Sequence, residues 1–239
     1  MGNNEFRVFG QREMAMEMDT CVISLGGSII VPKEIDTVFL KRFREIILEV
    51  KETRFVIICG GGSVCRDYQT VAREVTPATQ ADLDWIGIQA TRLNAELVRS
   101  MFGTMAHAKV IHDPSEPIDT DKWIIIGAGF RPGSSTDLRA VQLAERFGAA
   151  QVINMSNIDH VYSADPKKDP DAKKLPRLSW ADFRKLVGDE WDPGLNTPFD
   201  PIASRAAEAI GLTVVIIGND IQNLERLLKG ETFRGTTIA

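Results

Sequence analysis

Three glycine-rich segments of the chain have the composition of phosphate-binding loops. They are "SLGGSI" (24–29), "CGGGSV" (59–64) and "IGAGFRPGSSTD" (126–137), and each is at the end of an apolar run. Glycine lets backbone N–H groups turn toward an anion because it has no Cβ, and a helix that starts after the loop adds its own unpaired N–H groups. Two segments also have an arginine close by, Arg66 and Arg131. This pattern predicts the binding of phosphate groups.

The segments match neither of the common nucleotide-binding fingerprints. The chain contains no GxxxxGK[ST] pattern, which excludes a P-loop enzyme. Gly127, Gly129 and Gly133 have GxGxxxG spacing, one residue away from the dinucleotide pattern, so a nicotinamide enzyme is weakly supported. A tight turn would explain any single loop of this kind, but three of them favour a ligand site.

The elements expected to position these loops are strands that alternate with helices. Continuous β-branched apolar runs, typical of parallel strands buried on both faces, occupy residues 21–25, 54–59, 123–127, 150–155 and 213–218. Helical periodicity covers residues 36–52, 82–102, 135–148 and 201–211. The alternation predicts an α/β fold, a three-layer α/β/α sandwich with a central, mostly parallel sheet. Ligands of such sheets bind at the carboxyl ends of the strands, where all three loops are expected.

Several residues are typical of helix ends. Ser135 or Thr136 is expected to cap one helix and Ser179 another, with Asp182 in the third position of the latter. Gly148 and Gly211 stand where C-terminal caps belong.

Composition excludes several classes of protein. The 239 residues carry a net charge of −5, which argues against a nucleic-acid partner. No apolar run is long enough for a membrane span, and no signal-peptide core is present at the N-terminus. Three cysteines without metal-ligand or disulfide spacing indicate a reducing, cytoplasmic location. Residues 1–19 are interpreted as an N-terminal extension to a single domain at 20–239.

Six motifs in one order resemble the amino acid kinase family, and within it the archaeal-type uridylate (UMP) kinases. The resemblance covers roughly residues 20–237 and rests on "SLGGS", "GGGSVCRDY", "DLDWIGIQATRLNA", "GFRPGSSTD", "NIDHVYSADPKKDP" and "DPIASRAAEAIG". It implies transfer of the ATP γ-phosphate to UMP, giving UDP, with Mg²⁺ as the metal. It further implies a monophosphate-binding half at about 20–150, an ATP-binding half at about 151–239, and a homo-oligomer, a hexamer built as a trimer of dimers.

The resemblance also implies roles for individual residues. ATP would be bound by Gly26, Gly27, Ser28, Gly62, Arg66, Ser156, Asn157, Tyr162 and Asp165, with Lys167 or Lys168 nearby. UMP would be bound by Gly61, by Asp84 through its ribose hydroxyls, and by Phe130, Arg131, Pro132, Gly133, Ser134, Ser135 and Thr136. Asp137 would stand at the catalytic centre with Ser24 and Arg205, while the metal ligands stay unidentified.

The chain departs from the family pattern at three of these motifs. Ser24 and Arg205 stand where many relatives have lysine, and His160 stands where glycine is usual. Arg205 is therefore the candidate cation for the γ-phosphate. His160 is expected to touch a nucleotide or to narrow its pocket. Two alternatives stay open: a kinase for another small phosphate or carboxylate acceptor, and a nucleotide-binding sensor or storage protein without turnover. Simple structural roles also stay open for some of these residues; Asp84, for example, could be only a helix N-terminal charge.

Overall fold

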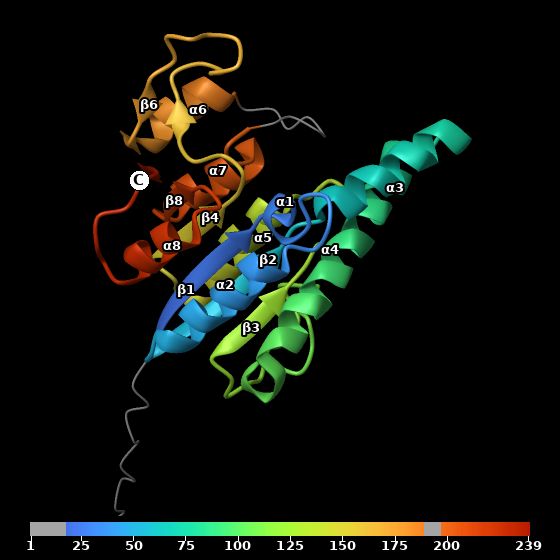
Figure 1. The fold of residues 1–239 in the computed structure, drawn as a ribbon, viewed down its shortest axis with the longest axis vertical. Helices are drawn as coiled ribbons and strands as arrows, with labels where there is room; N and C mark the ends of the chain where they lie inside the picture. Colours follow the sequence, from blue (N-terminus) through green and yellow to red (C-terminus); the bar gives the residue numbers. More distant parts are fainter. Residues whose placement is uncertain (1–17, 189–196) are drawn as a thin grey trace, which may run out of the picture.

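A seven-stranded, mostly parallel sheet forms the centre of the computed structural model, which describes residues 18–188 and 197–239 (Figure 1). The strand order is β3-β2-β1-β4-β8-β9-β7. Five strands run parallel in the order β3, β2, β1, β4 and β8, whereas β9 is antiparallel to β8. These five strands are β1 (Asp19–Leu25), β2 (Thr53–Cys59), β3 (Ile124–Gly127), β4 (Gln151–Met155) and β8 (Thr213–Ile217). All five strands predicted from the apolar runs are therefore confirmed within one or two residues at each end.

Helices cover both faces of this sheet, as the α/β/α prediction requires. The first face packs against α2 (Thr37–Glu49), α4 (Gln80–Phe102) and α8 (Ile221–Leu228). The second packs against α5 (Thr136–Phe147), α6 (Trp180–Val187) and α7 (Pro201–Ala209). A hydrophobic core lies between each face of the sheet and its helices, the first core on the first face and the second core on the second. Side chains of β1 and β2 alternate between them: Ile23 and Ile57 lie in the first core, and Val22 and Val56 lie in the second. Burial on both faces explains why the strands are apolar without interruption.

Local capping signals largely determine where the helices begin and end. The Ser135 side chain caps α5, Ser179 caps α6 with Asp182 at its third position, and Gly148 ends α5 with left-handed φ and ψ, all as predicted. One alternative was wrong. Asp84 is not an N-terminal charge, because α4 begins at Gln80 and its capping box is formed by Thr79 and Asp82. Asp84 lies in the second turn of the helix.

Shorter elements complete the structure. They are α1 (Gly27–Ile30), α3 (Gly62–Val75), a 3₁₀ turn at Gly103–Met105, β5 (Val161–Tyr162), β6 (Lys174–Leu175), β7 (Arg177–Leu178) and β9 (Thr236–Ile238). The β5 and β6 strands pair separately from the main sheet, and neither is among the strands predicted from the apolar runs. Together α3 and the amino-terminal part of α4 project from the body of the molecule (Figure 1). None of the described helices has the length and apolar composition of a membrane span. Of the extension predicted at 1–19, residues 1–17 lie outside the described part of the chain.

Candidate active site

The loops after β1 and β2 lie in direct backbone contact. Gly60 N–H donates to Leu25 O at 2.9 Å, and Ser63 N–H donates to Val31 O at 2.9 Å. A Cβ on Gly27 would lie 2.0 Å from the backbone N of Gly62, and Gly62 itself has a φ of +69°. Glycine at both positions is therefore a condition of the contact. The contact places the glycine N–H groups of both loops at one edge of the sheet.

Helix α4 fixes the β2 loop and the loop after β3. The Asn94 amide donates to Gly60 O at 2.8 Å and to Gly61 O at 3.1 Å. One turn earlier, Thr91 Oγ1 accepts from Gly129 N–H at 2.8 Å. Arg92 donates to Gly129 O and, at 3.4 Å, to Phe130 O. The sequence prediction did not include Thr91 and Asn94. They are polar residues three positions apart on one face of the helix, among apolar neighbours, and buried polar side chains of this kind usually form hydrogen bonds.

The loop predicted to bind UMP, residues 130–136, is tied to Asp84. One Asp84 oxygen accepts from Gly133 N–H at 2.9 Å, and the other accepts from the Gln80 amide at 2.8 Å. Arg131 and Gly133 are exposed, whereas Phe130, Pro132, Ser134, Ser135 and Thr136 are partly buried. Asp84 and this loop therefore lie together, as the resemblance implies, although they are 49 residues apart in sequence.

Asp137 lies at the start of α5, beside the end of β1. Its carboxylate accepts from Ser24 Oγ at 3.1 Å and from Asp200 N–H at 3.2 Å. Asp200 is buried and caps α7 through Ala203 N–H. Burial raises the pKa of Asp137 to about 6, and the Asp200 carboxylate acts in the same direction, whereas the two hydrogen bonds oppose the rise. Ser24 and Asp137, both predicted to be catalytic, are thus in contact.

Arg66 and Arg205, the arginines predicted to bind the phosphates of ATP, are both exposed. Arg66, on α3, directs its guanidinium to Pro32 O at 3.4 Å, next to the segment that follows α1. Arg205 lies on α7, one turn after the N-cap Asp200 that contacts Asp137. Within residues 18–188 and 197–239, Arg205 has no ion pair or side-chain hydrogen bond. No described residue neutralises its charge.

A cavity of about 640 Å³ is lined by three of the nine residues predicted to bind ATP. Asn157, Tyr162 and Asp165 line it, together with His160 and the two lysines Lys167 and Lys168. Ser156 connects this region to the β1 loop, since a Cβ on Gly26 would lie 3.3 Å from Ser156 Cα. Gly26 N–H also donates to Met155 O at 2.8 Å. The cavity and the β1 loop therefore flank the same strand, β4.

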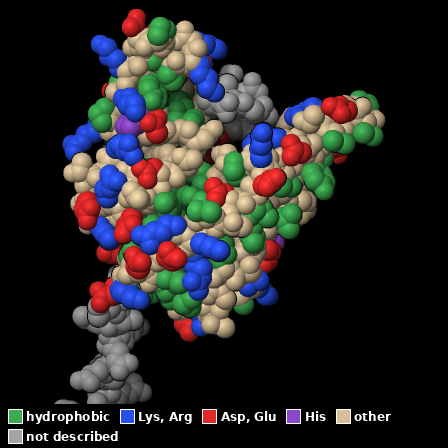
Figure 2. All heavy atoms as spheres, viewed as in Figure 1, with side chains coloured by type: hydrophobic (Ala, Val, Ile, Leu, Met, Phe, Trp, Pro, Cys, Tyr) green, Lys and Arg blue, Asp and Glu red, His purple; other side chains and the backbone are tan. Residues whose placement is uncertain are grey.

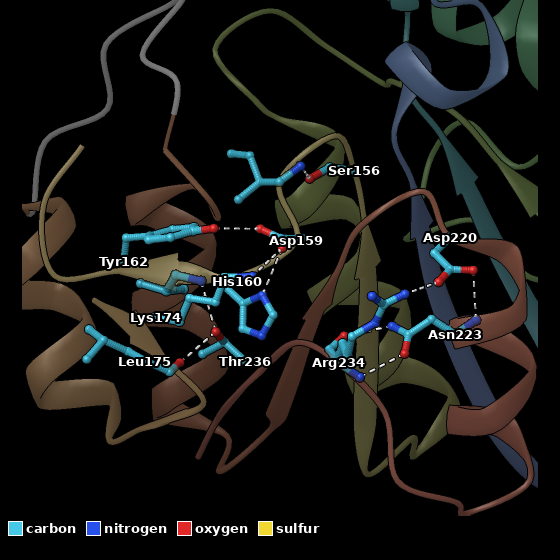
Figure 3. A network of polar contacts seen from close by, with 12 residues as sticks. Ser156, Asp159, His160, Tyr162, Lys174, Leu175, Asp220, Asn223, Arg234 and Thr236 are labelled. Atoms are coloured by element: carbon cyan, nitrogen blue, oxygen red, sulfur yellow. Dashed lines mark hydrogen bonds and ion pairs between the residues drawn. The ribbon is translucent and has the colours of Figure 1, made fainter. Parts of the chain in front are cut away.

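A network centred on Asp159 shapes one wall of this cavity (Figure 3). Asp159 accepts from Tyr162 OH at 3.1 Å and from Lys174 Nζ at 2.9 Å. His160 Nδ1 lies 3.1 Å from the same carboxylate, but the orientation is too poor for a hydrogen bond that satisfies the nitrogen. Burial opposes ionisation of Asp159, yet Lys174, His160 and Tyr162 outweigh it and lower its pKa to about 2. His160 is buried against the cavity, which supports the expectation that it narrows the pocket.

No closed metal cage is present in the described part of the chain, where no three ligating side chains cluster. Mg²⁺ typically binds one or two carboxylates together with substrate phosphates and water. Asp137, with Asp200 beside it, has the chemistry for the protein share of such a site.

Replacing Gly27 with alanine tests the loop contact. We expect the added Cβ to push the β1 and β2 loops apart because both neighbouring groups are backbone. Thermal denaturation should show a clear loss of stability, and nucleotide binding should fall with it. Gly87→Ala is the matched control, since its Cβ would meet only side chains of α3 at 3.3 Å and alanine favours a helix. Equal melting temperatures for the two variants would contradict the analysis.

Asp137→Asn tests the partly buried carboxylate of Asp137. A raised folded pKa means that Asp137 binds a proton more tightly in the folded than in the unfolded chain, so stability falls as pH rises from about 4 to about 6. Because asparagine cannot ionise, the variant should be more stable than the wild type by roughly 2–3 kcal/mol at pH 7.5 and by less at pH 4.5. Urea denaturation at the two pH values measures the difference. The exposed Asp119→Asn should show no such change, and a less stable Asp137→Asn protein at pH 7.5 would refute the expectation.

The sequence of the chain matches a known protein family. The sequence profile of the Amino acid kinase family matches residues 19–218. Uridylate kinase of Methanospirillum hungatei JF-1 is 36% identical over 227 residues, covering 92% of this chain and 95% of the relative. Uridylate kinase of Methanothrix thermoacetophila is 34% identical over 222 residues, covering 91% and 98%.

Solved structures agree with the sequence comparison. The crystal structure of uridylate kinase from Archaeoglobus fulgidus superposes with a TM-score of 0.78 at 35% identity, covering 92% of this chain and 99% of that one. UMP kinase from Bacillus anthracis shares the fold, with a TM-score of 0.74 at 20% identity, covering 92% and 95%. The chain belongs to the amino acid kinase family.

Proposed function

We propose that the chain is an ATP-dependent kinase that phosphorylates UMP to UDP. One observation carries the proposal: two glycine loops meet beside Asp137, between a cavity on the β4 side and a loop fixed to Asp84 on the β3 side. This arrangement offers two nucleotide sites with backbone N–H groups between them. Full-length relatives named uridylate kinase support UMP as the acceptor.

The chemistry requires little more than positioning and charge neutralisation. Phosphoryl transfer proceeds in line, with negative charge on the γ-phosphoryl oxygens. The N–H groups of Gly27, Ser28, Gly61 and Gly62 would hold these oxygens, and Arg205 would approach from α7. The acceptor is already an ionised phosphate, so no strong base is needed. Mg²⁺ bound with ATP would neutralise further phosphate charge, and Asp137 would be the protein carboxylate that holds it.

We assign the donor, ATP, to the β4 side of this sheet edge and the acceptor, UMP, to the β3 side. On the β4 side, Ser156, Asn157, Tyr162 and Asp165 would hold the adenosine of ATP, while Gly62 and Arg66 would face its phosphates. On the β3 side, Gly61 and the loop at 130–136 would hold UMP. Asp84 would bind the ribose hydroxyls, because a carboxylate offers only acceptors and retains lone pairs beyond those used by Gly133 and Gln80.

A coupled ADP-release assay against a panel of nucleoside monophosphates and small acids tests the activity. We expect Mg²⁺- and ATP-dependent turnover with UMP above all other acceptors. Turnover with a different phosphate or a carboxylate instead would make the chain a kinase of another specificity. ATP binding by calorimetry without turnover on any acceptor would indicate a nucleotide-binding protein.

Arg205→Ala tests the proposed γ-phosphate cation. Loss of one charged contact to the transferring group typically lowers the rate about 10²–10³-fold. We therefore expect kcat to fall by that order, with the KM for UMP little changed. Arg205→Lys keeps the charge and should restore part of kcat. Equal kcat in the alanine variant and the wild type would remove Arg205 from the mechanism.

We also propose that the chain is a homo-oligomer, as the resemblance implies. Apolar side chains form a stripe on the projecting helix α3, where Tyr68 is 68% exposed, Val71 56% and Val75 78%. Hydrophobic surface is visible along this projection in Figure 2. Their spacing of three and four residues places them on one helix face, and exposed apolar stripes of this kind mark contact surfaces.

Light scattering after size exclusion tests the stripe. The double variant Val71→Asp and Val75→Asp should have a lower mass than the wild type, since burying two carboxylates in an apolar contact is unfavourable. Val38→Asp is the matched control, because Val38 is also 78% exposed but stands on α2. A monomeric wild type, or an unchanged mass in the double variant, would contradict the proposal.

A further inference from the structure

Arg139 is a buried arginine directly behind the loop at 130–136. It lies on α5 and is only 3% exposed. Across residues 18–188 and 197–239, no carboxylate lies within ion-pair distance of its guanidinium, and its Nε has no hydrogen-bond partner. Charged side chains are rarely buried unless they are paired. The missing counter-charge requires an explanation.

The contacts of Arg139 are directed mainly at the loop. Nη2 donates to Ser134 Oγ at 3.0 Å, and the guanidinium lies 4.9 Å from the ring centroid of Phe130. Nη1 donates to Gln142 one turn later on the same helix. Arg139 therefore connects α5 with two of the residues proposed to surround UMP.

Two further arginines meet the loop at the same place. The Arg131 guanidinium lies 5.9 Å from the same Phe130 ring, and Arg92 donates to Phe130 O. Burial and the charge of Arg131 lower the pKa of Arg139, while Asp113 opposes this. None of the three guanidinium groups has an ion pair with a described carboxylate. Three guanidinium groups thus lie around Phe130 without an ion pair to a described residue, although the Asp84 carboxylate is bound to Gly133 of the same loop.

We propose that Arg139 is a positioning residue for the acceptor nucleotide: it holds Phe130 and Ser134 in place, and the acceptor's phosphate dianion supplies the counter-charge that no described residue provides at ion-pair distance. Stability alone does not explain a buried, unpaired cation, because an apolar residue of similar volume is often neutral or stabilising in its place. The inference rests on the proposed UMP kinase activity. Sequence reasoning had no signal for Arg139, which reads as an ordinary charge on an amphipathic helix.

Arg139→Met tests the proposal, with Arg139→Lys as the conservative variant. Hydrogen bonds to charged groups contribute enough that their loss corresponds to roughly a 10–100-fold weaker interaction. We expect the methionine variant to raise the KM for UMP by that order while the KM for ATP stays within about twofold. Its melting temperature without ligand should equal or exceed that of the wild type, and the stabilisation by added UMP should shrink. The lysine variant should recover part of the UMP affinity.

Arg54→Met is the matched control. Arg54 also has a buried Nε without a partner and lies 5.8 Å from a phenylalanine ring, that of Phe147, but it is at the amino end of β2, away from the loops. Its replacement should leave both KM values unchanged.

The outcomes separate the two proposals. A wild-type protein that does not phosphorylate UMP overturns the proposed function and this inference with it. An active wild type with an unchanged UMP KM in Arg139→Met overturns the inference alone. A methionine variant that fails to fold, melts well below the wild type, or loses affinity for both nucleotides equally would show Arg139 to be structural and would also overturn it.

Discussion

The contact between the β1 and β2 loops is the constraint on which the rest of the site depends. Gly27 and Gly62 approach so closely that no side chain fits between them. Only this approach brings the backbone N–H groups of two adjacent strand ends to one place. Because the strands are parallel and neighbours in the sheet, their carboxyl ends already share an edge, and the glycines convert that edge into a surface for anions.

Helix α4 makes this surface rigid. It buries Ala95 and Val98 against the first core, and its Thr91 and Asn94 side chains satisfy backbone groups of the neighbouring loops. Such side-chain bonds replace the pairing that loop backbone lacks, and a buried carbonyl without a partner would cost about 1–3 kcal/mol. The same helix therefore stabilises the fold and determines the distance between the second and third glycine loops.

Charge is unbalanced on both sides of the site. Asp137 is partly buried beside Asp200 and has a raised pKa, whereas Arg92, Arg131 and Arg139 surround Phe130 without described ion pairs. Both arrangements are unfavourable in the free protein. In the proposed function, anionic ligands and a metal ion would complete the charge balance and make both arrangements favourable, at some cost in the stability of the free protein.

The sequence by itself determined the layers of the fold and most helix ends. Continuous apolar runs specify buried parallel strands, and short-range signals such as Ser135, Ser179 and Gly148 act within one helical turn, so they can be read directly. The resemblance brought Asp84 and the loop at 130–136 into one predicted site, and the structure places them in contact. The roles of the individual site residues remain predictions.

The short strands, the bonds that support the loops and the burial of Arg139 depend on the tertiary structure alone. Two-residue strands such as β5 and β6 carry too few residues for a pattern, and Asp84 was only one of several acids near a helix start. The support of the β2 loop by Asn94 depends on a bond between residues 34 positions apart. The burial of Arg139 without an ion pair depends on where the carboxylates of the described residues lie. Local sequence cannot encode such facts, because burial and pairing are set by which distant segments the folded chain brings together.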